Sequence, residues 1–158
     1  MTFKTMIPIV LALSASPAIG EELQPYVGDW RGKGWVQSTA DTKEVLRCRL
    51  AANLKTDQQI DFDGTCATPA ASGSFFLALA FGDDGRQIAA RIRSSAAAEA
   101  LDLKGLWDGK SAALTGTSED GMAFQLNLEF DGSDYFVLAI SSGEGAERLL
   151  RLRAAFQR

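Results

Sequence analysis

Apolar and polar side chains alternate along nearly the whole chain beyond residue 25. In the clearest run, from Met122 to Phe130, every second residue is apolar and the intervening ones include Gln125, Asn127 and Glu129. A period of two sends successive side chains to opposite faces of an extended strand, so the pattern predicts strands with one buried face. The predicted strands are Tyr26–Ser38, Lys43–Lys55, Gln59–Thr68, Ser74–Phe81, Gln87–Ser94, Leu101–Asp108, Ser111–Ser118, Met122–Phe130, Tyr135–Ser141 and Glu147–Phe156.

The segments between the predicted strands carry the glycine and acidic residues that tight turns require. They include Asp83-Asp84-Gly85, Asp108-Gly109, Glu119-Asp120-Gly121, Asp131-Gly132 and Gly143-Glu144-Gly145. Residues 95–100 have an Ala/Glu composition that is compatible with a helical turn, but we expect a connector there. Short turns predict an antiparallel meander, and closing the meander removes its sheet edges. We therefore expect an all-β fold, a single antiparallel up-and-down β-barrel of about eight to ten strands.

The first twenty residues follow a different pattern. Lys4 is their only charge, an apolar run extends from Met6 to Ala15, and Ser16-Pro17-Ala18 supplies small residues for a peptidase. This order is typical of a cleaved signal peptide, and the apolar run is too short to span a bilayer. We expect cleavage after about Ala18 or Gly20, a barrel domain over residues 21–158, and a periplasmic or secreted protein. A buried N-terminal helix is the alternative.

Two cysteines lie on the apolar faces of neighbouring predicted strands. A hairpin that turns about Asp57 pairs residues of the same face and places Cys48 opposite Cys66. A slip of one residue would destroy this match. An oxidising compartment favours a disulfide between them. Two buried free thiols, or reactive or metal-bound cysteines, are the alternatives. The other pairs in this register are Leu54 with Ile60, Ala52 with Phe62, and Leu50 with Gly64.

Charge and composition exclude several classes of function. The chain has 16 Lys and Arg against 20 Asp and Glu, a net charge of −4, and no concentrated basic run, which argues against nucleic acid binding. It contains no histidine, which excludes Ser-His-Asp catalysis and histidine ligation of zinc or haem. Asp61 and Asp63 share a strand face that we expect to be solvated. We therefore predict a non-catalytic protein with no metal and no cofactor.

The segment from Gly28 to Trp35 reads Gly-Asp-Trp-Arg-Gly-Lys-Gly-Trp. Trp30 shares its strand face with Gly28, Gly32 and Gly34, which predicts a large ring at one end of a barrel where the strand bends. This G-x-W motif resembles that of the calycin group, which includes lipocalins, fatty-acid-binding proteins and nitrobindin-like barrels. The extended G-x-W-x-G-x-G form is most similar to the last of these. The resemblance implies a lipocalin-like barrel in which Trp30 closes the floor and the interior accepts a small apolar ligand.

A second resemblance uses some of the same residues. Gly28-x-Trp30, Cys48-Arg49-Leu50 and Gly64-Thr65-Cys66 are similar to segments of small periplasmic barrels that inhibit secreted metalloproteases. The resemblance implies that the segment before Tyr26, including Glu21, Glu22 and Leu23, enters the cleft of a secreted protease.

We therefore favour a non-catalytic module that binds a small apolar ligand. The inhibitor and a structural envelope protein are the alternatives, and the oligomeric state is left open. Trp35 and Phe76 fall on the outward face, where either a partner surface or packing at the barrel end explains them. The pairs Arg91/Arg93 and Arg151/Arg153 are expected to be solvated. The expected ligand-lining residues, for which packed core is the alternative, are Leu50, Phe62, Leu79, Phe124, Leu126 and Leu152.

Overall fold

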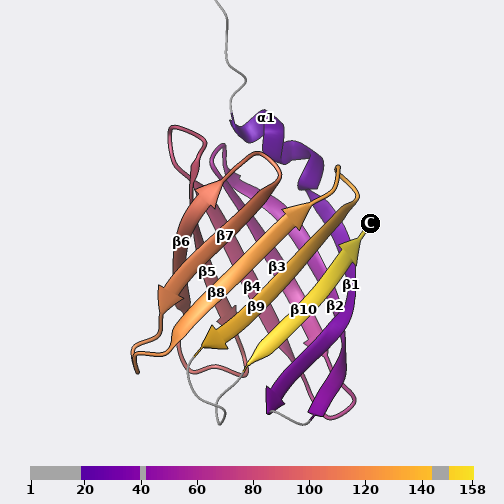
Figure 1. Ribbon diagram of the computed structural model, residues 1–158. Coiled ribbons are helices and arrows are strands. Elements are labelled where there is room, and N and C mark those ends of the chain that lie inside the picture. Colours follow the sequence, from indigo (N-terminus) through magenta and orange to yellow (C-terminus); the bar gives the residue numbers. More distant parts are fainter. Residues whose placement is uncertain (1–18, 40–41, 144–149) are drawn as a thin grey trace, which may run out of the picture.

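The computed structural model describes residues 19–39, 42–143 and 150–158. In this part of the chain ten antiparallel strands form one closed barrel, with a short helical segment across one end (Figure 1). Each strand pairs with its neighbours in sequence, and the first strand pairs with the last. The elements are α1 (Ile19–Leu23), η1 (Gln24–Tyr26), β1 (Gly28–Thr39), β2 (Thr42–Thr56), β3 (Gln59–Ala67), β4 (Ser72–Phe81), β5 (Gln87–Ser94), β6 (Leu101–Trp107), β7 (Ser111–Thr117), β8 (Ala123–Phe130), β9 (Tyr135–Gly143) and β10 (Arg151–Gln157).

The structure confirms the predicted all-β, up-and-down barrel and its strands. Most strand ends differ from the predicted ones by one or two residues. β10 begins at Arg151 instead of Glu147, and residues 147–149 lie outside the described residues. The segment from Ser95 to Ala100 contains no helix and forms the expected connector. Most of the predicted signal peptide, residues 1–18, also lies outside the described residues.

The hairpin of β2 and β3 adopts the predicted register. Cys48 lies opposite Cys66, and Leu50 lies opposite Gly64. The two sulfur atoms form a disulfide bond of 2.03 Å. Because the cysteines are 18 residues apart, the chain-entropy account of a disulfide assigns the bond about 3 kcal/mol of stability.

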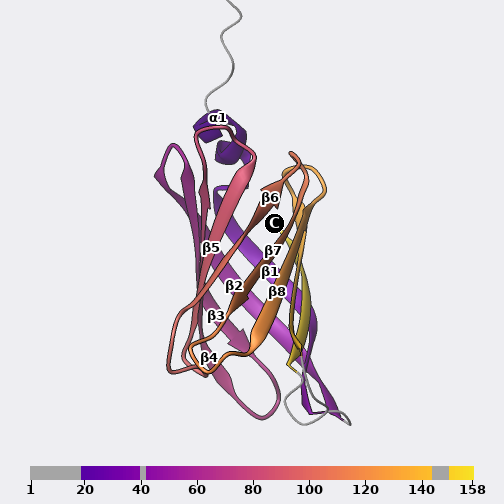
Figure 2. The ribbon, with the colours of Figure 1, turned by 60° about the vertical axis from the view of Figure 1, so that its left-hand side comes forward.

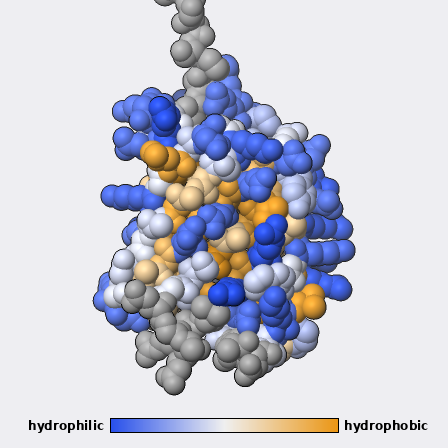
Figure 3. All heavy atoms as spheres, in the orientation of Figure 1, coloured by the Kyte–Doolittle hydropathy of each residue, from blue (hydrophilic) through white to orange (hydrophobic). Residues whose placement is uncertain are grey.

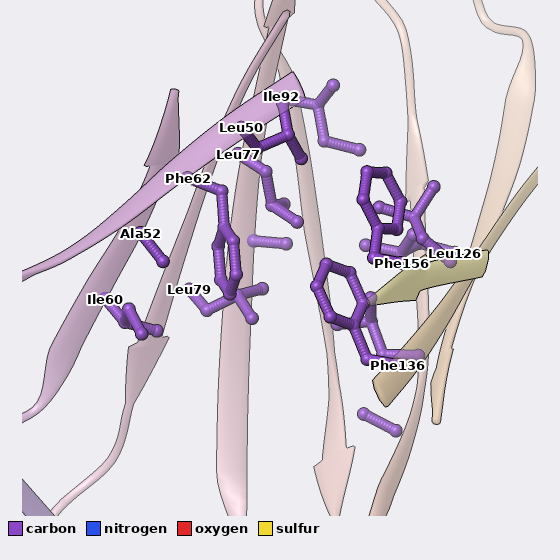
Figure 4. Packing of buried hydrophobic residues seen from close by; sticks show 14 of the residues in the cluster. Leu50, Ala52, Ile60, Phe62, Leu77, Leu79, Ile92, Leu126, Phe136 and Phe156 are labelled. Atoms are coloured by element: carbon purple, nitrogen blue, oxygen red, sulfur yellow. The ribbon is translucent and has the colours of Figure 1, made fainter. Parts of the chain in front are cut away.

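The inward faces of the strands meet in one continuous apolar core. Figure 4 shows Phe62, Leu77 and Leu79 on one wall of the barrel, facing Phe136 and Phe156 across the interior. Side chains therefore fill the middle of the barrel. The largest side chains that are less than 2% exposed are Trp30, Phe62, Phe136, Phe156, Ile60, Leu77, Leu79, Leu103, Leu114, Leu126, Leu128 and Leu138.

Gly32 leaves room for an aromatic ring in this core. A Cβ atom at Gly32 would lie 2.4 Å from the ring of Phe156. That ring stacks on Phe136 with 4.5 Å between centroids. Packing therefore requires glycine at this position, because any side chain would displace the stacked rings.

α1 and η1 lie across the end of the barrel where β1 begins (Figure 2). Leu23 is 4% exposed and belongs to the core. Gly20 lies against the turn between β2 and β3, where a Cβ atom would be 3.1 Å from the Cα atom of Asp57. We call this end of the barrel the capped end, and the opposite end, where β2 and β10 begin, the distal end.

Candidate functional site

Aromatic side chains close the barrel at its capped end. The ring centroid of Phe136 lies 4.9 Å from that of Trp30, 5.1 Å from that of Phe130 and 5.4 Å from that of Phe62. Trp30 is 1% exposed. Edge-to-face and stacked contacts at these distances add stability to the area that the rings bury. This half of the interior is packed core.

Tyr26 and Arg158 hold Trp30 at the capped end. Its indole Nε1 donates a hydrogen bond of 2.9 Å to the carbonyl oxygen of Tyr26. The guanidinium of Arg158 lies 5.4 Å from the ring centroid of Trp30 and donates to the carbonyl oxygen of Val27. Arg158 is also 3.9 Å from a carboxylate oxygen of Asp134. The last residue of the chain therefore fastens the start of β1.

Tyr26 is a titratable group of the cap with a shifted pKa. Burial raises the pKa of the Tyr26 hydroxyl, and the negative charge of Glu22 raises this pKa further. Its ring lies 4.6 Å from that of Phe130. The cap therefore favours the neutral form of this phenol.

The distal end differs from the capped end in its cover, because in the described residues α1 and η1 lie across the capped end and no helix lies across the distal end. Four apolar residues at this end, Val36, Leu101, Phe124 and Leu152, are half-buried although they point into the barrel and pack against the core. They come from β1, β6, β8 and β10. Solvent therefore reaches apolar side chains of the interior at the distal end, which makes this end the candidate site.

Carboxylates lie beside the distal end. Glu99 follows β5 in the connector to β6, and Glu119 lies in the turn between β7 and β8. A hydrogen bond with Glu119 raises the pKa of Glu99, and the charges of Glu119 and Asp120 add to this effect. These carboxylates make the potential negative next to the connector between β5 and β6 and the turn between β7 and β8.

The six residues predicted to line a ligand site all point into the barrel. Leu50, Phe62, Leu79 and Leu126 are at most 3% exposed and lie within the packed core. Phe124 and Leu152 are half-buried and lie at the distal end. The sequence periodicity correctly predicted which face of each strand points into the barrel. It does not indicate how far along the barrel axis a residue lies. For the same reason it missed Val36 and Leu101.

The segment before Tyr26 is folded onto the barrel. Glu21 and Glu22 are exposed, but Leu23 is buried in the core next to them. The resemblance to protease inhibitors implied a segment that enters a partner's cleft. In the structure this segment covers the barrel end, and the protease partner stays a prediction.

The two outward aromatic residues lie under cations. The Nζ atom of Lys43 is 4.4 Å from the ring centroid of Trp35, and the guanidinium of Arg93 is 4.3 Å from that of Phe76. Arg93 lies directly opposite Phe76 on the neighbouring strand. These contacts show how the outer surfaces of both rings are partly covered.

A shallow groove crosses the outside of β7, β8, β9 and β10. Its volume is about 490 Å³. Its lining includes the outward residues Ala113, Val137 and Ala139, while Glu129 and Arg153 contribute charge. Figure 3 shows apolar atoms gathered over the middle of this face. Small outward side chains between longer ones produce the groove.

Neither a metal cluster nor a membrane-spanning helix is found in residues 19–39, 42–143 and 150–158. No group of three or more His, Cys, Asp or Glu side chains there is arranged to hold a metal ion. Within the same ranges, no helix is long and apolar enough to cross a membrane.

Comparison with solved structures finds barrels of the same kind. Rv2717c from M. tuberculosis matches with a TM-score of 0.67 and 14% identity over 90% of this chain and 98% of that one. The S-type phycobiliprotein lyase CPES from Guillardia theta matches with a TM-score of 0.57 and 13% identity over 89% and 90%. A redesigned β-barrel, mFAP0, bound to DFHBI, matches with a TM-score of 0.53 and 9% identity over 85% and 100%.

The likeness is one of fold. All three matches are far below the identity at which function can be transferred. No protein-family model matches the chain, and no curated protein matches its sequence. The function must therefore be argued from the site.

Proposed function

We propose that the protein is a non-catalytic binding module that takes a small, uncharged apolar ligand at the distal end of its barrel. The supporting observation is the difference between the two ends. Aromatic rings and α1 cover the capped end, whereas no helix of the described residues covers Val36, Leu101, Phe124 and Leu152, which keep part of their apolar surface accessible at the distal end. Binding of a ligand that removes this apolar surface from water is favourable.

Two half-buried leucines at opposite ends of the barrel make a matched test. Leu152 lies at the distal end, and Leu54 lies on the inward face of β2 near the capped end. The measurement is a fluorescence titration with Nile red, a neutral apolar probe. We expect Leu152→Ala to weaken binding about tenfold, because truncation removes apolar contact worth about 1–2 kcal/mol. Leu54→Ala should leave the affinity unchanged.

Two outcomes would contradict the proposed site. One is the absence of saturable binding by the wild-type protein. The other is an equal loss of affinity in the two leucine variants at matched thermal stability, because this would place the probe away from the distal end. Native mass spectrometry after mild purification gives an independent check for a retained ligand.

We further propose that residues 1–18 act as a signal peptide and that the protein works in an oxidising compartment. The disulfide between Cys48 and Cys66 supports this, because such bonds persist mainly outside the reducing cytosol. Cleavage after Ala18 would leave α1 intact, whereas cleavage after Gly20 would remove its first two residues. The intact mass of the exported protein is expected to equal the mass calculated for a chain that begins at Ile19. An intact mass that includes Met1 would contradict the proposal.

A further inference from the structure

Cations from both ends of the chain meet on one outer face of the barrel. The pairing of β1 with β2 places Arg31 directly opposite Arg49 and Lys33 directly opposite Arg47. The pairing of β1 with β10 adds two more arginines to the face. We call this surface the basic face; its cations are Arg31, Lys33, Lys43, Arg47, Arg49, Arg151 and Arg153. All seven are exposed. Figure 3 shows long hydrophilic side chains along the edge of the molecule formed by these strands.

The cations of the basic face are not paired with carboxylates in residues 19–39, 42–143 and 150–158. As far as the described residues show, none of the seven cations forms an ion pair with a carboxylate; the ion pairs found are Arg91–Asp102 and Arg158–Asp134. Asp29, at the start of β1, is the acidic residue that shares the outward face of the described parts of these three strands. Like charges directly opposite each other on paired strands are destabilising. The fold therefore carries a repulsion that an external anion would relieve.

Apolar and aromatic side chains lie within the basic face. Trp35 is flanked by Arg153 on β10 and Val45 on β2. Val45 is 59% exposed. Trp35 is half-buried, with Lys43 above its ring. A tryptophan surrounded by lysines and arginines is the combination found where proteins meet the interface of a bilayer.

The spread of the cations favours an extended anionic surface over a single small anion. From Arg31 to Gln37 the outward residues of β1 span six residue steps, or about 20 Å at the rise of a strand. A small anion would contact two or three of these cations. An array of lipid headgroups can contact all seven cations. Burial of the exposed apolar side chain of Val45 in the membrane interface is also favourable.

We propose that the basic face docks the protein onto a membrane surface that contains anionic phospholipid. Attraction between headgroup phosphates and the seven cations supplies the affinity, and Trp35 and Val45 enter the interfacial region. The docking is independent of the ligand site proposed for the distal end, because the basic face lies on the outer surface of β1, β2 and β10.

Co-sedimentation with vesicles tests this docking in the mature, oxidised protein. We expect binding to vesicles that contain phosphatidylglycerol, no binding to pure phosphatidylcholine, and loss of binding at high salt, because salt screens surface charges. Binding should shift the tryptophan emission to shorter wavelength. Trp35→Phe should abolish this shift, since Trp30 and Trp107 lie in the barrel interior.

Reversing the charge of Arg49 should weaken vesicle binding without destabilising the fold. Arg49→Glu replaces a like-charged pair with Arg31 by an ion pair, so we expect Tm to rise by about 2 °C. Vesicle affinity should fall by about 25-fold, because each unit of charge near an anionic surface is worth about fivefold in affinity. Arg49→Gln should lower the affinity about fivefold without lowering Tm. The control is Lys104→Glu, an exposed cation on the outer face of β6.

Three results would overturn the proposal. The first is equal affinity for vesicles with and without phosphatidylglycerol. The second is an equal loss of affinity in Arg49→Glu and Lys104→Glu. The third is preference for a single-stranded DNA oligomer over vesicles at equal phosphate concentration, because this would assign the face to nucleic acid.

Discussion

Gly32 illustrates how one residue permits the packing of several others. Its missing side chain leaves the space that the ring of Phe156 occupies, and Phe156 in turn stacks on Phe136. Gly32 belongs to the G-x-W-x-G-x-G segment, whose alternation predicted a large ring, Trp30, at one end of the barrel on the same face as three glycines. The identity of the ring that fills the space could not be predicted, because Phe156 lies at the other end of the sequence.

Replacing Gly32 with alanine should therefore destabilise the protein. The added Cβ atom would overlap the Phe156 ring, and overpacking of this kind costs about 2 kcal/mol. Urea unfolding followed by tryptophan fluorescence measures the difference.

Gly143→Ala is the matched control, because nothing lies within 4 Å of a Cβ atom at Gly143. The unfolding free energy of this variant should change by less than about 0.5 kcal/mol. An equal effect of the two substitutions would show that the packing around Phe156 is not the cause.

At the scale of elements, the strands and one hairpin register could be predicted, and the cap could not. β2 and β3 alternate clearly, and their cysteines supplied a second constraint on the register. α1 has five residues, too few for a helical period to be recognised in the sequence. Its role became visible only through Leu23, which is buried in the core, and Gly20, which packs against Asp57.

Alkaline pH should loosen this cap. The pKa of Tyr26 is higher in the folded protein than in the unfolded chain, where it is about 10. Its contribution to stability is therefore complete below pH 10 and is lost as the pH rises through the folded-state pKa. Thermal unfolding between about pH 8 and 11 measures this loss.

Tyr26→Phe provides the comparison, because it keeps the ring but cannot ionise. The decrease in Tm above about pH 10 should be smaller in this variant than in the wild type. Identical pH profiles would show that ionisation of Tyr26 does not couple to folding.

At the scale of the whole molecule, the closure of the barrel produces the features that sequence reading missed. Arg31 and Arg153 are far apart in the sequence, so no basic run signalled the basic face. They lie on adjacent strands because β1 pairs with β10. Arg151 and Arg153 are exposed as expected, and the barrel places them on the same outer face as the cations of β1 and β2. The difference between the capped and distal ends likewise depends on three-dimensional depth, which alternation does not encode.

The pairing of β1 with β10 also sets an order for folding. Hairpins such as β2–β3 need only local chain and can form early, whereas the closing pair joins residues near the two ends of the sequence. Loop-closure entropy makes such long-range pairing slow. Until β10 arrives, β1 keeps an unpaired edge that invites aggregation. Of the ten strands described, β10 is the last to leave the ribosome, and it covers the exposed edge of the first.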